Sequence, residues 1–413
     1  MRIPRSAPVG GRLKKRARRQ RHLSIFLVVL AAVACGPDGP KPGAGVAEFV
    51  GHVEQRVPMW MGAYGIPGAS LALIVDGEPV WSMAFGYADP RQDRAMELDA
   101  VYRVESLSKP VTAWGVMRLE EEDLVELDGA VEAQFSEFRL PPSEFDTRQV
   151  TVRRLLSGTS GLPLGTLGME YTPGEPLARF VAAGMYGRSD RGGRVLEEAS
   201  VHRLHAAEAT GLGIYGVVAD GYGLGHFVEE LPSGESAVFH GGQGNGWMTH
   251  MHWVPATGEG IVILTNSQRS WPFMARILGD WARWRDLPTV GMTRITLAAR
   301  LVGALVGILL AGAVWQILRL GLDLRVGRRR LAPLRREGRL LRAVQLGVAG
   351  ALIGLVGWAV QAEYLFLASV VPHLMGWFAA ALVVVALVLA ASAFLPKPGA
   401  LPPSSRSLES DLL

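Results

Sequence analysis

Two side chains one helical turn apart carry the clearest chemical signal in the sequence. Ser106 and Lys109 stand in the segment S-L-S-K-P, which precedes a helix-compatible run over 111–124. At the start of a helix this spacing puts both side chains on one face, so the amine can reach the hydroxyl. A serine hydroxyl is a poor nucleophile until a base takes its proton, and a lysine with a lowered pKa can be that base. The pair predicts catalysis with Ser106 as nucleophile and Lys109 as its activating partner.

On its own the pair also fits an ordinary helix start with a solvated lysine. The order of several other short segments around this pair decides between the two interpretations. These segments are 66–69, 76–77, 86–89, the S-x-x-K itself, 155–163, 240–242 and 262–267. In this order they resemble the class C β-lactamases and related penicillin-binding-protein-like serine hydrolases, over roughly residues 47–266. The resemblance implies an α+β fold of the β-lactamase/transpeptidase type, with a five-stranded antiparallel sheet flanked by helices.

The same resemblance supplies candidate substrate-binding residues. His240 and Gly242 match the strand motif that lines the active site in this family, usually K-T-G or H-x-G. A histidine there can donate a hydrogen bond to the substrate, and a glycine lets the strand approach it closely. The resemblance makes the backbone N–H of Ser106 one oxyanion donor and places the second near Gly242 or Gln243.

One element of the family pattern is missing from the sequence. Members carry a Y-x-N element between S-x-x-K and the last strands, where the tyrosine helps to move protons. No tyrosine in this chain is followed two residues later by asparagine, and the stretch 163–240 is short for the family, so we expect a truncated helical subdomain. The conceivable substitutes lack the context of the motif and also fit packing roles; they are Tyr171, Tyr186, Tyr215 and Tyr222.

Hydrophobic patterning gives the elements that must position these residues. Two apolar runs joined through Asp76 and Gly77, a pair that tolerates positive φ, predict a hairpin. Three further strands and two flanking helices follow from periodicity and turn residues. The expected strands cover 69–75, 79–85, 236–240, 247–254 and 260–265, and the expected helices cover 47–62 and 272–285.

Three uncharged apolar segments follow the globular part, which we expect over 46–288. Each is long enough to cross a bilayer. The loop 319–342 is rich in arginine, and basic loops favour the cytoplasmic side. We therefore expect a protein of the bacterial cell membrane whose catalytic domain is extracytoplasmic (periplasmic). The expected membrane region is 295–396, with spans at about 301–318, 343–362 and 375–395, followed by a tail over 397–413.

The first 35 residues have the pattern of an export signal, and a Gly/Pro-rich linker over 36–45 follows them. A block of nine basic residues precedes an apolar stretch over 23–34, which is too short for a comfortable membrane span. Cys35, the only cysteine of the chain, follows Ala32-Val33-Ala34. This arrangement fits a lipoprotein signal with lipidated Cys35, ordinary cleavage after an A-x-A triplet, or a free thiol, and all three remain open.

Composition excludes several classes of function. Eighteen of the 42 basic residues lie in two blocks, at 2–21 and 319–342. The rest of the chain holds 24 basic and 36 acidic residues and is therefore acidic overall, so we expect no nucleic-acid partner. His250 and His252 share a strand face without a carboxylate or cysteine partner in view, so we expect no metal site. His202 and His205 fit a solvated helix face. No cofactor motif is apparent.

The sequence thus predicts a membrane-anchored serine hydrolase that acts through a covalent acyl-enzyme on an amide, ester or β-lactam carbonyl. We expect a cell-wall peptide or a small ester as the substrate. We also expect contact with membrane lipid, and the oligomeric state stays open. Loss of Y-x-N motivates the alternative of a catalytically impaired relative that acts as a membrane-tethered binding or sensor module. A gene with an internal deletion is a third alternative.

Overall fold

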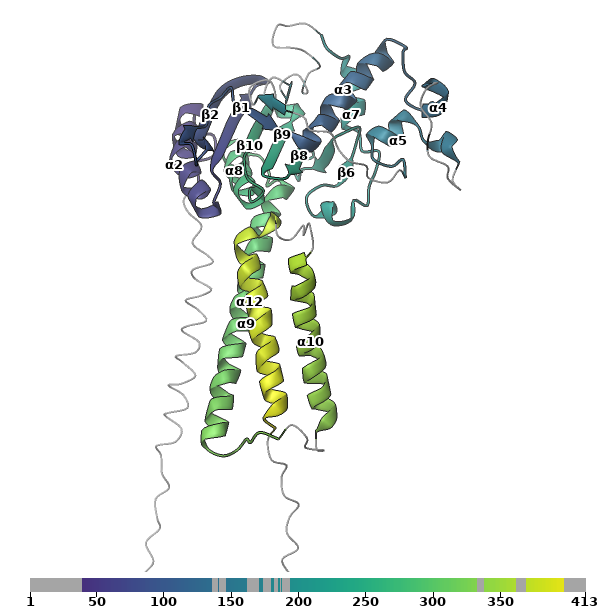
Figure 1. The fold of residues 1–413 in the computed structure, drawn as a ribbon. Coiled ribbons are helices and arrows are strands. Elements are labelled where there is room, and N and C mark those ends of the chain that lie inside the picture. The colour runs from purple at the N-terminus through teal and green to yellow at the C-terminus, as the bar shows by residue number, and fades with distance from the viewer. Residues whose placement is uncertain are drawn as a thin grey trace, which may run out of the picture.

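A computed structural model describes residues 39–135, 140, 146–161, 171–173, 180–181, 185, 187, 194–332, 338–361 and 369–396. Its elements form a head, from α2 (Val46–Tyr64) to the short turn η5 (Gly291–Thr293), above three long helices (Figure 1). The predicted signal, Cys35, the C-terminal tail and parts of the expected truncated subdomain between residues 162 and 193 lie outside these residues.

The head is built on one antiparallel sheet whose strands follow the order β3-β2-β1-β10-β9-β8-β7-β6. The five central strands are those that the sequence predicts. The short strands β3, β6 and β7 were not predicted, because two to four residues carry no readable alternation. The bounds are β1 Gly68–Val75, β2 Glu78–Asp89, β3 Arg94–Ala95, β6 Gly221–Tyr222, β7 Phe227–Glu230, β8 Ser236–Gly244, β9 Trp247–Val254 and β10 Glu259–Thr265. Strands β4 (Val101–Arg103) and β5 (Tyr171–Pro173) form a separate pair.

The turn between β1 and β2 confirms the predicted hairpin. Asp76 and Gly77 have φ of 52° and 76°, the positive values that a two-residue type I′ turn requires at both positions. The twist of this turn matches that of the strands it joins. The turn sets the pairing of Val75 with Glu78, and a register shift between Leu73 and Ile74 then brings Ala69 opposite Phe85.

Two helices cover one face of the sheet. Helix α2 and helix α8 (Trp271–Trp284) pack together with β1 and β10, and Phe49 stacks on Trp284 with ring centroids 4.2 Å apart. On the opposite face a second cluster includes Tyr102, Val104 and Leu107. This second cluster anchors the turn that carries Ser106.

Shorter helices lie beside the sheet and build the other wall of the site (Figure 1). Helix α3 opens this group, and its buried Ala113, Trp114 and Met117 join a cluster with Leu204 and Leu224. The bounds are α3 Ser108–Glu121, α4 Val131–Gln134, α5 Val152–Leu156 and α7 Glu198–His205, with the 3-10 turns η1 Glu105–Leu107, η2 Thr147–Gln149, η3 Gly213–Val217 and η4 Pro255–Thr257.

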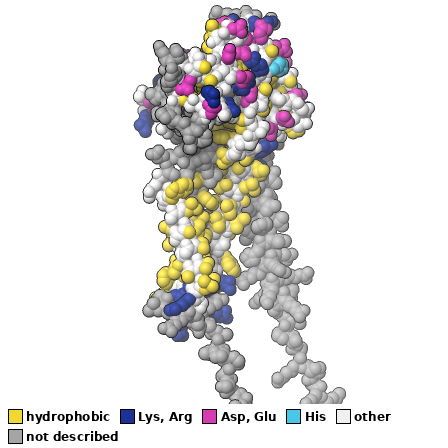
Figure 2. Space-filling view, turned by 90° about the vertical axis from the view of Figure 1, so that its right-hand side faces the viewer, with side chains coloured by type: hydrophobic (Ala, Val, Ile, Leu, Met, Phe, Trp, Pro, Cys, Tyr) yellow, Lys and Arg dark blue, Asp and Glu magenta, His cyan; other side chains and the backbone are white. Residues whose placement is uncertain are grey.

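Helices α9 (Arg294–Arg325), α10 (Arg339–Gln361) and α12 (Pro372–Phe394) are long and apolar enough to cross a membrane. Each contains one of the predicted apolar segments, except that residue 395 falls just outside α12 and residue 362 lies outside the described residues. Hydrophobic side chains cover this part of the surface, and Lys and Arg side chains gather at its end away from the head (Figure 2). There Arg329 pairs with Asp323 at 3.2 Å.

Candidate active site

The turn before helix α3 positions the serine. Glu105 has φ of 54°, an uncommon value for a residue other than glycine, and Ser106 follows it within η1. Ser108 Oγ donates a 2.6 Å hydrogen bond to the Glu105 carbonyl, which holds this turn against the first residues of α3. Backbone strain of this kind is often kept where it presents a functional side chain.

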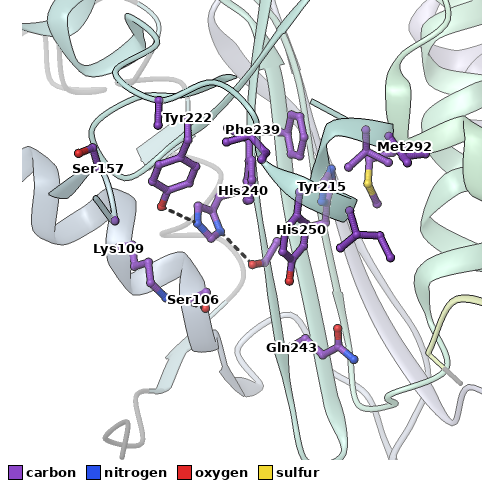
Figure 3. A pocket seen from close by; sticks show the side chains of 18 of the residues that line it. Ser106, Lys109, Ser157, Tyr215, Tyr222, Phe239, His240, Gln243, His250 and Met292 are labelled. Carbon is purple, nitrogen blue, oxygen red and sulfur yellow. Dashed lines mark hydrogen bonds between the residues drawn. The ribbon is translucent and has the colours of Figure 1, made fainter. Parts of the chain in front are cut away.

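Lys109 reaches back to the serine, as the spacing predicts. Its Nζ lies 2.8 Å from Ser106 Oγ, and both side chains line the same cavity (Figure 3). Burial lowers the pKa of Lys109, and the nearby Glu105 carboxylate opposes this shift. A lowered pKa raises the fraction of neutral amine, the form that can accept the serine proton.

Glycine lets strand β8 pack directly against the turn that carries the serine. A Cβ on Gly242 would overlap the Val104 carbonyl oxygen and Thr249 Oγ1. Thr249 Oγ1 also donates a 2.9 Å hydrogen bond to that carbonyl, which ties β9 to the same turn. Beyond Phe239, none of the described strands pairs with the edge of β8 that faces η1. Gly242 therefore brings an open strand edge next to Ser106.

His240 is buried beside this edge, where both of its ring nitrogens have partners. Its Nδ1 donates to the Gly241 carbonyl at 2.9 Å, and its Nε2 lies 3.1 Å from the Tyr222 hydroxyl. Burial, with the Lys109 charge as a smaller contribution, lowers the pKa of His240 to about 3. A neutral ring with its proton on Nδ1 accepts at Nε2, so Tyr222 is the donor. His240 Nε2 thus orients the Tyr222 hydroxyl, and donation from His240 to a substrate stays a prediction.

The side chain of Gln243 is also held by another residue of the protein. Its side-chain oxygen accepts a 3.0 Å hydrogen bond from Trp271 Nε1, which connects β8 to the first turn of helix α8. Both side chains line the cavity. The side chain of Gln243 therefore has a structural partner, while its backbone remains the candidate oxyanion donor.

The far wall of the site comes from two glycine-containing loops. Ser157 and Thr159 are joined by a 2.8 Å hydrogen bond between their hydroxyls, and both line the cavity. Gly225 has φ of 76°, and a Cβ there would lie 2.8 Å from the Lys109 carbonyl oxygen. This close contact holds the loop after Tyr222 against the start of α3.

These walls line an open cavity of about 1140 Å³. Pockets for drug-sized ligands are roughly 300–1,000 Å³, so this cavity has room for a substantial substrate. Ser106, Lys109 and His240 line it from three different elements (Figure 3). Such an arrangement can perform nucleophilic attack on a carbonyl carbon.

His252 and His205 pack in the interior of the head, whereas His202 is exposed as the sequence predicts. His252 stacks on Phe239 at 5.2 Å, and His205, which the sequence placed on a solvated face, packs against His226 and Trp253. That expectation was wrong for His205, because the far side of α7 contacts the sheet. Within the described part of the chain, no group of three or more metal-ligating side chains comes together.

A family model described as Beta-lactamase matches residues 49–183, a segment that includes Ser106 and Lys109. This chain contains a β-lactamase-family domain. The family is one of β-lactamase-like serine hydrolases, and the antiparallel sheet with its flanking helices is the β-lactamase/transpeptidase-like fold that the sequence predicts.

Relatives of the β-lactamase-family domain match part of the chain. The serine beta-lactamase-like protein LACTB, mitochondrial, of Bos taurus is 35% identical over 98 residues, 24% of this chain and 18% of the relative. Penicillin-binding protein 4 of Amycolatopsis lactamdurans is 34% identical over 133 residues, 32% of this chain and 34% of the relative. The chain thus spans a fifth to a third of these relatives. The octameric penicillin-binding protein homologue from Pyrococcus abyssi aligns with a TM-score of 0.45 and 17% identity, covering 56% of this chain and 77% of that one.

Sequence reasoning about the β-lactamase-family domain left Tyr222 among four equal tyrosines. The structure brings Tyr222 into the cavity with Ser106 and Lys109, and Tyr215 lines it as well. The side chain of Tyr171 and the whole of Tyr186 lie outside the described residues. The signal that distinguishes Tyr222 is its setting in G-Y-G-L-G: Gly225 lets this loop approach α3, and Gly221 and Gly223 let it approach the segment 204–209 at and after the end of α7.

Proposed function

We propose that this chain is a membrane-anchored serine hydrolase that forms a covalent acyl-enzyme on Ser106. The observation that carries the proposal is the 2.8 Å contact between Lys109 Nζ and Ser106 Oγ in the wall of a large cavity. The match to the Beta-lactamase family model supports it. The substrate is an amide, ester or β-lactam.

In the proposed reaction, neutral Lys109 accepts the Ser106 proton as Oγ bonds to the carbonyl carbon. The negative charge that develops on the carbonyl oxygen is stabilised by the backbone N–H of Ser106 and an N–H of β8 near Gly242 or Gln243. The bond to the leaving group then breaks, and Lys109 returns the proton to that group. Water, deprotonated by the same amine, releases the acyl group from Ser106.

Turnover of a chromogenic ester and a chromogenic β-lactam by the full chain in detergent tests this function. We expect hydrolysis of at least one of them, and loss of that activity in Ser106→Ala. Ser233→Ala, on the exposed turn between β7 and β8, is the matched control and should retain activity. Folded protein that hydrolyses neither compound, or a Ser106→Ala variant as active as the intact chain, would contradict the proposal.

The absence of Y-x-N favours a second candidate, a catalytically impaired protein that binds cell-wall fragments or partner proteins. Loss of an acid/base partner typically costs about 10²–10⁴ in rate. The same assay separates the candidates, because a binding protein would retain its fold and show no turnover that depends on Ser106.

The proposed location is the bacterial cell membrane, with the head on the outer, periplasmic side. The arginines between α9 and α10 support this orientation, since basic loops stay in the cytoplasm. A tag inserted near Arg330 should be protected from reagents outside intact cells, and labelling of that tag from outside would reverse the orientation. Lipidation of Cys35 remains part of the proposal and predicts a mass shift that Cys35→Ala removes.

A further inference from the structure

The cavity that contains Ser106 extends to the membrane helices. Besides the catalytic pair, its lining includes Met292 in η5, Ile295 and Ala298 at the start of α9, and Val370 just before α12. One continuous space therefore joins the nucleophile to the outer ends of two helices that can cross a bilayer.

The depth of this end can be estimated from helix geometry. The uncharged part of α9 begins at Leu301, and each helical residue rises about 1.5 Å, so Ala298 lies about 4.5 Å and Ile295 about 9 Å before it. The headgroup region on each side of a bilayer is roughly 5–7 Å thick. The membrane end of the cavity therefore lies at the level of the lipid headgroups.

The rim of the cavity at this end carries exposed apolar side chains beside one charged residue, Arg294. Turn η3 presents Ile214 and Val217, whose exposed fractions are 60% and 54%. Arg294 Nη1 donates a 2.8 Å hydrogen bond to the Val217 carbonyl, which fixes η3 to the outer end of α9. Exposed apolar side chains beside a membrane helix are typical of a surface in contact with lipid.

We propose that the substrate is a long-chain acyl ester taken from the outer leaflet, with its hydrocarbon chain along the cavity between η3 and α9. This inference rests on the proposed function. Ser106 Oγ bonds to the acyl carbon, the ester C–O bond breaks, and the leaving alcohol takes the proton held by Lys109. Water then releases the fatty acid from Ser106.

A chain-length series tests the assignment. The full chain in lipid nanodiscs would hydrolyse p-nitrophenyl esters with acyl chains from acetyl to dodecanoyl. Burial of a methylene group contributes about 0.8 kcal/mol, which corresponds to a gain in kcat/KM of up to about fourfold per methylene until the cavity is filled. We expect kcat/KM to rise over at least four added methylenes.

A pair of neighbouring variants locates the chain. Ala298→Trp fills the membrane end of the cavity, whereas Leu297→Trp adds the same bulk at a position that is 55% exposed and outside the cavity lining. Ala298→Trp should lower kcat/KM for the dodecanoyl ester at least tenfold and for the acetyl ester less than twofold. Leu297→Trp should change neither, and Ala298→Leu should act in the same direction as Ala298→Trp with a smaller effect.

The outcomes separate this inference from the proposed function. Hydrolysis of the acetyl ester that depends on Ser106 but shows no gain with chain length would overturn the lipid assignment and leave the hydrolase standing. Equal losses for short and long esters in Ala298→Trp would also overturn it. Lack of hydrolysis of every ester, with a folded head, would contradict the proposed function itself.

Discussion

Replacement of Gly242 by alanine tests the close packing on which the site depends. The added Cβ would overlap the backbone carbonyl oxygen of Val104 by more than about 1 Å relative to ordinary contact. Because both groups belong to backbone, β8 must move away from the turn that carries Ser106. Overpacking of this kind costs about 1–3 kcal/mol of stability. A misplacement of about 1 Å at a catalytic site can cost about 10² in rate.

Gly51→Ala on the exposed side of helix α2 is the control that adds the same methyl group away from the site. A Cβ there would meet no heavy atom outside its own helix turn within 4 Å. We expect Gly242→Ala to lower kcat/KM about 100-fold and Tm by roughly 2–12 °C, and Gly51→Ala to keep both close to those of the unmodified protein. Ester hydrolysis and thermal unfolding of the full chain in detergent measure both. A Gly242→Ala variant with unchanged rate and Tm would refute the packing argument.

Three further predictions concern single side chains. Lys109→Arg keeps the charge but removes the base, so kcat/KM should fall about 10²–10⁴-fold, and an unaltered rate would count against Lys109 as the base. In the unmodified protein kcat/KM should rise with pH through a pKa below 10.5. Burial lowers the pKa of His252 to about 3, so below pH 6.5 the unfolded state binds a proton that the folded state does not, and the free energy of unfolding falls as the pH falls. In His252→Phe this decrease between pH 7 and pH 5, measured by unfolding at both, should be smaller by about 2 kcal/mol. Tyr222→Phe leaves His240 Nε2 without its donor and should cost about 1–3 kcal/mol of stability but no more than about tenfold in kcat/KM; a larger loss of rate would make Tyr222 an acid/base.

Local sequence was enough to predict the parts of the site that lie close together in the chain. Ser106 and Lys109 meet because three residues make one helical turn, and the turn at Asp76 and Gly77 follows from their tolerance of positive φ. The central strands were readable from their apolar runs. These features depend on spacing and residue type alone.

Contacts between elements that lie far apart in the sequence were not predictable in this way. Tyr222 meets His240 only because β7 returns the chain beside β8, and the short strands that create this path carry no pattern. The extension of the cavity to Ala298 joins segments nearly two hundred residues from Ser106. No local signal could have indicated this contact between the head and the start of helix α9.

The most direct test of the central claim is covalent labelling of the full chain in detergent with a fluorophosphonate, followed by mass spectrometry of the digested protein. The account predicts one adduct on the peptide that contains Ser106, lost in Ser106→Ala and slowed in Lys109→Arg. Adduct on another serine, or undiminished labelling of a folded Ser106→Ala variant, would contradict Ser106 as the nucleophile.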